Sequence, residues 1–140
     1  MNVRWVGAER TVYDLVGGSD WFYKLMDYFY EHVESHNQIR HLYPEDLSDS
    51  KKNTADFLIQ YWGGPSHYSE KRGHPRLRMR HAPFPIGKAE RDAWLSSMDF
   101  ALAKMNPETR ILEAMKEYFN TAAHHMLNNE NSNEGESNVT

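Results

Sequence analysis

The sequence of 140 residues contains no cysteine. Disulfide bonds, zinc–thiolate sites and thiol catalysis are therefore excluded, and a reducing compartment is tolerated. Long apolar runs are also missing. No stretch approaches the roughly 20 apolar residues of a membrane span, and the first residues lack the apolar core of a signal peptide. We therefore expect a cytoplasmic protein with no membrane partner.

Positive charge is scarce as well. The sequence has 20 acidic residues against 16 basic ones, which gives a formal net charge of −4. A protein that binds nucleic acid usually carries an excess of Lys and Arg. The basic run from Lys71 to Arg80 is the exception, and it is too short to neutralise many phosphates. The charge pattern therefore predicts no nucleic-acid partner.

Aromatic residues, in contrast, are abundant, with 4 Trp, 8 Tyr and 6 Phe in a chain of single-domain length. Apolar residues recur at every third or fourth position, which is the period of an amphipathic helix. This period predicts helices over Trp21–Glu34, Ser50–Trp62 and Gly87–Asn106, and a last helix from Pro107 to Leu127 with Asn106 as its N-cap. No segment alternates as a strand does. We expect an all-α fold.

The remaining segments predict one domain over residues 10–128. A short helix is expected over Arg10–Val16, a helical turn over Gln38–His41, and irregular structure over Ser66–Arg72. Residues 1–9 are interpreted as an N-terminal arm. Residues 129–140 are polar and lack any period, which is typical of a disordered tail.

The most constrained stretch is Gly73-His-Pro-Arg-Leu-Arg-Met-Arg-His81. Pro75 suits the first position of a helix, and Pro83 and Pro85 forbid its continuation. The result is a short helix that holds His81 in its last turn. A single imidazole binds a free metal ion weakly, but it suffices for an iron already held by a macrocycle. A purely structural histidine remains an alternative.

The other histidines give weaker signals. His32 and His36 lie four apart, but they fall at a helix end among charged residues and lack the glutamate of a zinc-protease motif, so we expect a solvated surface. His124 and His125 are adjacent and fit the electrostatics of a helix C-terminus. No serine lies in a nucleophile motif, and no glycine-rich loop could cradle phosphate.

Several short sequence motifs, spread over most of the chain, carry a resemblance to a known family. They are Tyr61-Trp62-Gly63-Gly64-Pro65, Tyr68-Ser-Glu, Gly73 to His81, Glu90-Arg-Asp-Ala-Trp94-Leu95 and, earlier, Gly17-Gly18, Phe29-Tyr30 and Tyr43-Pro44-Glu45-Asp46. In this order, from about Thr11 to Asn128, they closely resemble the group II truncated haemoglobins. The resemblance implies a globin-like, two-over-two helical sandwich around one haem b. The first long helix would pair with the second, and the last two with each other.

The resemblance also implies roles for individual residues. His81 matches the proximal iron ligand, and we expect its second ring nitrogen to bond the Leu77 carbonyl. The distal, ligand-binding side would be formed by Tyr30, Tyr43, Ser50, Thr54 and Trp94. The cofactor-binding set is Tyr30, Tyr43, Phe57, Tyr61, Tyr68, Leu77, Arg80, Trp94 and Met98, with Arg80 toward a propionate. Asn53 stands where relatives often carry an arginine.

The implied function is binding of O2 at a five-coordinate iron. Oxygen transport and redox chemistry with O2, NO or peroxide, such as NO dioxygenase or peroxidase-like activity, are both compatible with the residues. CO would be a further ligand, and the redox options need a reductase that the sequence does not identify. A monomer and a homodimer both remain open. The alternative is a helical sensor or interaction module with a non-functional pocket, because periodicity alone explains Tyr30 and Trp94 as core residues.

Overall fold

The computed structural model describes residues 10–129, which form seven α-helices and one 3-10 turn. The elements are α1 (Val12–Leu15), α2 (Ser19–Glu34), η1 (Arg40–Leu42), α3 (Ser48–Tyr61), α4 (His67–Arg72), α5 (Leu77–His81), α6 (Lys88–Met105) and α7 (Thr109–His125). The expected all-α fold is confirmed. None of the described helices is long and apolar enough to cross a membrane. The predicted arm over residues 1–9 and the tail from residue 130 lie outside the described residues.

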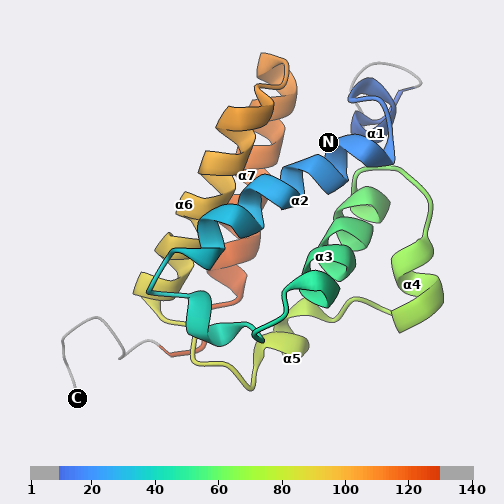
Figure 1. Cartoon of the computed structure of the whole chain (residues 1–140). Helices are drawn as coiled ribbons and strands as arrows, with labels where there is room; N and C mark the ends of the chain where they lie inside the picture. Colours follow the sequence, from blue (N-terminus) through green and yellow to red (C-terminus); the bar gives the residue numbers. More distant parts are fainter. Residues whose placement is uncertain (1–9, 130–140) are drawn as a thin grey trace.

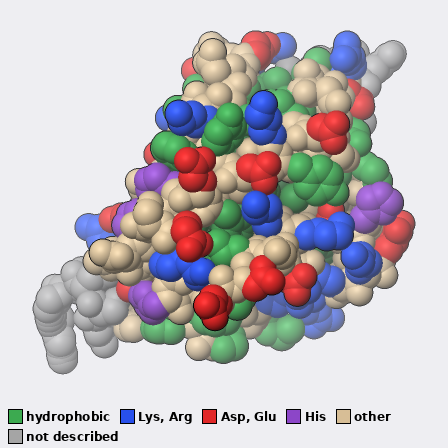
Figure 2. Space-filling view, viewed as in Figure 1, with side chains coloured by type: hydrophobic (Ala, Val, Ile, Leu, Met, Phe, Trp, Pro, Cys, Tyr) green, Lys and Arg blue, Asp and Glu red, His purple; other side chains and the backbone are tan. Residues whose placement is uncertain are grey.

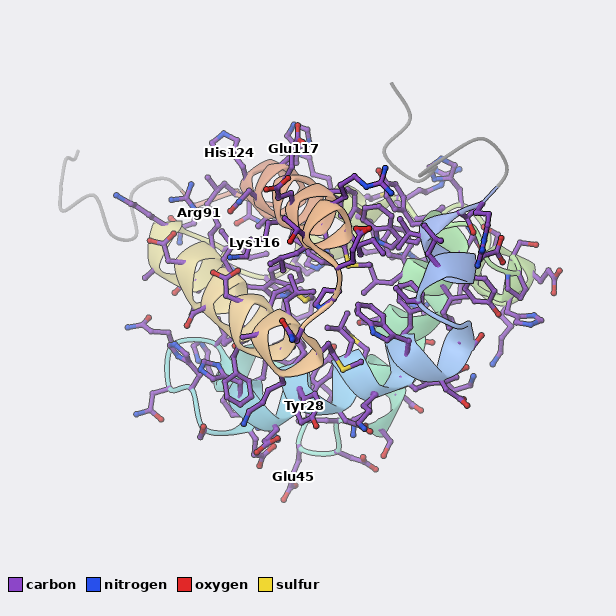
Figure 3. All side chains as sticks on the ribbon, turned by 90° about the horizontal axis from the view of Figure 1, so that it is seen from above. Tyr28, Glu45, Arg91, Lys116, Glu117 and His124 are labelled. Atoms are coloured by element: carbon purple, nitrogen blue, oxygen red, sulfur yellow. The ribbon has the colours of Figure 1, made fainter. Side chains whose placement is uncertain are left out.

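The four long helices form two pairs, α2 with α3 and α6 with α7. Helix α2 packs against α3 and α6, and α6 packs against α7. Figure 1 shows α6 and α7 side by side, with α2 crossing them and α3 beside α2. Seen from above, Arg91 near the start of α6 and His124 near the end of α7 lie close together (Figure 3), and an Arg91 Nη1 donates to His124 Nδ1 at 3.4 Å. The two helices are therefore antiparallel.

The core follows from the spacing of apolar residues. In α2 the buried side chains recur three and four apart, as the sequence predicts; they are Phe22, Leu25, Met26, Phe29, Tyr30 and Val33. In α7 the buried side chains are Ile111, Met115, Phe119 and Ala123. Because these faces meet in one cluster, burial of apolar surface fixes how the long helices cross.

The Gly63-Gly64 pair ends α3 and lets it approach α1. Gly63 has φ of 109°, and a Cβ there would lie 2.4 Å from the Thr11 Cβ. A Cβ on Gly64 would lie 2.6 Å from the Tyr13 ring. The Tyr13 N–H donates to the Trp62 carbonyl at 3.0 Å across this contact. Larger residues at these two positions would separate the two helices.

Three local expectations were wrong. Asn106 is not an N-cap: it takes the left-handed conformation at the end of α6, and Glu108 caps α7 instead. The segment expected to be irregular contains α4, because Ser69 exchanges hydrogen bonds with the Gln60 side chain at 2.8 and 2.9 Å. The helix bearing His81 begins at Leu77 rather than at Pro75, because Arg76 has φ of 46°.

Candidate functional site

A cavity of about 390 Å³ lies among α2, α3, α5, α6 and α7. Most residues expected at the cofactor line it together: Tyr30, Tyr43, Ser50, Thr54, Phe57, Tyr68, Leu77, Arg80, His81 and Trp94. Two do not. Met98 is buried in the core, and the Tyr61 ring stacks on Tyr118 with centroids 4.2 Å apart. The volume falls within the range of small-molecule and cofactor sites.

Sequence reasoning missed part of the wall. Additional lining residues are Ile39, Leu42, Pro44, Asn53, Leu58, Arg72, Phe84, Ile86, Glu90, Arg91, Tyr118, Phe119, Ala122, Ala123 and Met126. The apolar period of the last helix places Phe119 and Ala122 on its inward face, but nothing local shows that this face reaches the cavity. Most of the added side chains are apolar or aromatic, which suits a flat, apolar ligand.

His81 enters the cavity from α5. Its Nδ1 lies 2.7 Å from the Leu77 carbonyl oxygen, one turn back in the same helix. A carbonyl only accepts hydrogen bonds, so Nδ1 carries the ring proton and Nε2 keeps a free lone pair. This tautomer is the one that can bind a metal through Nε2. The carbonyl is the acceptor expected from the sequence.

The hydroxyl-bearing side chains of the cavity come from other elements. The Tyr30 hydroxyl on α2 donates to the Ser50 carbonyl at 3.3 Å and lies 3.1 Å from the Thr54 hydroxyl. The Tyr30 and Tyr43 rings meet edge to face, with centroids 5.7 Å apart. Trp94 forms a hydrogen bond with Tyr43, and because an indole N–H only donates, the Tyr43 oxygen accepts it.

Burial keeps both tyrosines protonated. Loss of water raises the pKa of Tyr30 to about 12, while its hydrogen bond with Thr54 acts in the opposite direction. Burial also raises the pKa of Tyr43 far above its ordinary value, with a contribution from Tyr30 and an opposing one from Trp94. Both hydroxyls therefore remain hydrogen-bond donors throughout the neutral range.

The basic residues around α5 have structural partners. The Arg80 guanidinium donates to the Pro75 and Arg72 carbonyls, at 2.7 and 2.9 Å, although it also lines the cavity. Arg78 donates to the His125 carbonyl at 2.9 Å. Elsewhere charges are mixed: Figure 2 shows acidic and basic side chains interspersed over the face with α2 and α3. Lys51 and Asp27 bridge these helices at 3.1 Å.

His32 corrects another expectation. It is half-buried, and its Nδ1 lies 2.8 Å from the hydroxyl of Ser97, which is fully buried. The Ser97 hydroxyl donates to the Ala93 carbonyl, so it accepts from His32. Within residues 10–129 no group of three or more His, Asp or Glu side chains could hold a metal ion. His32 is therefore a packing residue between α2 and α6 rather than part of a solvated surface.

Comparison with known proteins identifies the family. The family model described as bacterial-like globin matches residues 11–128. The chain belongs to this family. Group 2 truncated hemoglobin YjbI of Bacillus subtilis is 41% identical over 111 residues, which make up 79% of this chain and 84% of that protein. The predicted membership of the group II truncated haemoglobins is confirmed.

Solved structures of globins share the fold. The hemoglobin of Chloroflexus aurantiacus is 51% identical, with a TM-score of 0.82, and the match covers 86% of this chain and 99% of that one. The structure named truncated oxygen-avid haemoglobin, from Bacillus subtilis, is 40% identical with a TM-score of 0.79, covering 83% and 98%. These matches confirm the expected two-over-two globin fold.

Globins of this family bind haem with its iron, and the cavity residues fit that group. The wall is mainly apolar and aromatic, as a flat macrocycle requires. His81 offers a single imidazole with its Nδ1 proton already committed to the Leu77 carbonyl, so its Nε2 would be the atom that holds the iron. Arg72, Arg80 and Arg91 also border the cavity, and their positive charge would suit the propionates of such a group.

Proposed function

We propose that this globin holds haem b through His81 and binds O2 on the side of the cavity formed by Tyr30, Tyr43 and Trp94. Haem iron supplies an open coordination position for a diatomic ligand such as O2, NO or CO. The observation that carries the proposal is the geometry of His81, whose Nδ1 lies 2.7 Å from the Leu77 carbonyl while its ring borders the cavity.

The donors around the cavity would favour a diatomic ligand that carries partial negative charge. Trp94 donates to the oxygen of Tyr43, which lines the cavity, and this bond leaves the Tyr43 hydroxyl hydrogen unused. It is therefore available to a ligand. A hydrogen bond to a charged partner contributes about 1.5–3 kcal/mol, which slows release by about 10- to 100-fold at 1.4 kcal/mol per decade.

Slow release suits some globin functions better than others. A protein that retains O2 is a poor carrier and a better scavenger or redox catalyst, for which a reductase would supply electrons. One matched structure carries the name oxygen-avid haemoglobin. We therefore place O2 retention, with onward reaction with NO or peroxide, ahead of oxygen transport.

The test is the absorption spectrum of the purified chain titrated with haemin. We expect a Soret band in wild type that weakens strongly and moves in His81→Ala, because the axial ligand is lost. The matched control is His41→Ala, since His41 is exposed and borders no part of the cavity. A wild-type titration that gives only the spectrum of free haemin would contradict the proposal and favour a sensor or interaction module with an empty pocket.

A further inference from the structure

Helix α5 is too short to hold His81 in place by itself. It has five residues, no side-chain cap at its start and no fully buried residue. Isolated helices below roughly 12–15 residues are marginal in water, so the position of α5 depends on other elements. The chain before α5 is attached by Arg80, a residue of α5 itself, which donates to the Pro75 and Arg72 carbonyls. The end of α5 needs a support of its own.

That support comes from the segment after α7. The Asn128 side-chain amide donates to the His81 carbonyl at 3.2 Å and to the Phe84 carbonyl at 2.9 Å. Its oxygen accepts from the Ile86 N–H at 2.9 Å. An amide has two donor hydrogens and one oxygen, so every polar group of this side chain is used on residues 81–86.

Backbone contacts reinforce the same attachment. The N–H groups of Asn128 and Asn129 donate to the Ile86 carbonyl at 3.0 and 3.1 Å. One turn earlier, Arg78 of α5 donates to the His125 carbonyl at the end of α7. The end of a long, packed helix thus holds both α5 and the chain that leaves it (Figure 1).

From these contacts we infer that Asn128 is a positioning residue for the His81 imidazole. It fixes the backbone of His81, Phe84 and Ile86, and so sets the tilt of the last turn of α5 relative to the cavity. Asn128 is exposed, so water competes for each bond. Its loss should disturb the position of His81 more than the stability of the fold. The inference rests on the proposed role of His81.

The experiment is resonance Raman spectroscopy of the ferrous protein with haem bound, read at the iron–histidine stretching band. In Asn128→Ala we expect the band to broaden and shift to lower frequency, because the imidazole samples more orientations. Asn120→Ala is the matched control, since Asn120 is exposed on α7 and makes no side-chain hydrogen bond within the described residues. Its band should coincide with that of wild type.

A second variant separates hydrogen bonding from packing. Asn128→Asp keeps the shape and the acceptor for Ile86, but it sets a carboxylate oxygen against the His81 and Phe84 carbonyls. It should shift the band as Asn128→Ala does, and it replaces that variant if the alanine protein does not fold. Hydrogen exchange of the peptide containing Ile86 should accelerate several-fold in Asn128→Ala, where the N–H loses its acceptor.

Each outcome has a clear meaning. Faster exchange at Ile86 with an unmoved iron–histidine band would overturn the inference, because the contact would then be structural only. An Asp variant with the wild-type band would overturn it as well. If the band persisted in His81→Ala, the proposed function itself would fail, and that result is independent of Asn128.

Discussion

The two sides of the cavity are built in different ways. Tyr30 and Trp94 stand on α2 and α6, which bury apolar faces against each other, and Tyr43, at the end of η1, packs against the same core. His81 stands on a five-residue helix without a fully buried residue, held by hydrogen bonds from Arg80, Arg78 and Asn128. One side is positioned by packing and the other by polar attachments. The donors should therefore be rigid, whereas His81 should respond to single polar substitutions.

The largest expected effect on stability comes from a substitution in the packed side of the cavity. Phe29 is fully buried on α2, and its ring meets Tyr30 and Trp94 edge to face, with centroids 4.9 and 5.3 Å away. Phe29→Ala should lower the free energy of unfolding by about 3–5 kcal/mol, because a large cavity opens in the core. Urea denaturation of the two proteins measures this.

The matched control lies on α5. Met79 is 60% exposed, so Met79→Ala should change the free energy of unfolding by no more than about 0.5 kcal/mol. If Met79→Ala were as damaging as Phe29→Ala, the contrast between the two sides would be wrong.

A smaller effect is the contribution of Tyr30 to stability, which depends on pH. The pKa of Tyr30 is about 12 in the folded protein against 10.0 for the ordinary group, so the folded state holds the proton more tightly. The stabilisation is complete below pH 10 and is lost as pH rises toward 12. At roughly 1.4 kcal/mol per pKa unit, the loss is about 2–3 kcal/mol. Urea denaturation between these pH values should show this decline, and it should be shallower in Tyr30→Phe. Equal slopes would contradict the assignment.

How far the sequence predicts this molecule depends on the range of the interactions. The period of three and four in α2 and α7 reports burial directly, so those helices and their inward faces could be predicted. The αL turn at Asn106 could not, because the same Asn-Pro pair suits both a helix end and a helix start. Helix α4 has one buried side chain, Tyr68, and depends on Gln60, outside any local pattern.

The residues of the site show the same contrast between short-range and long-range interactions. The His81–Leu77 hydrogen bond lies within one helical turn, and the sequence contains all that it requires. The motif resemblance, rather than periodicity, directed attention to Tyr30 and Trp94. Asn128 was missed because its partners lie 42 to 47 positions away in the chain.

The smallest expected effect is on O2 dissociation, and it distinguishes the hydrogen-bond donors of the cavity from one another. The Tyr43 oxygen accepts from Trp94, which leaves its hydrogen for another partner, whereas the Tyr30 hydroxyl already donates to the Ser50 carbonyl. Tyr43→Phe should therefore accelerate O2 dissociation by about 10- to 100-fold, and Tyr30→Phe should have a weaker effect. Trp94→Phe should also accelerate it, because the Tyr43 oxygen loses its donor. Stopped-flow displacement of O2 measures the rates, and a Trp94→Phe rate equal to that of wild type would remove Trp94 from the proposal.

The central claim is that the His81 imidazole fills the axial position. The most direct measurement is the ferrous absorption spectrum of His81→Gly with haem bound, before and after free imidazole is added. We predict that the variant lacks the five-coordinate, histidine-bound spectrum and that imidazole restores it by entering the space that the side chain leaves. A variant whose spectrum equals that of wild type before imidazole is added would contradict the account.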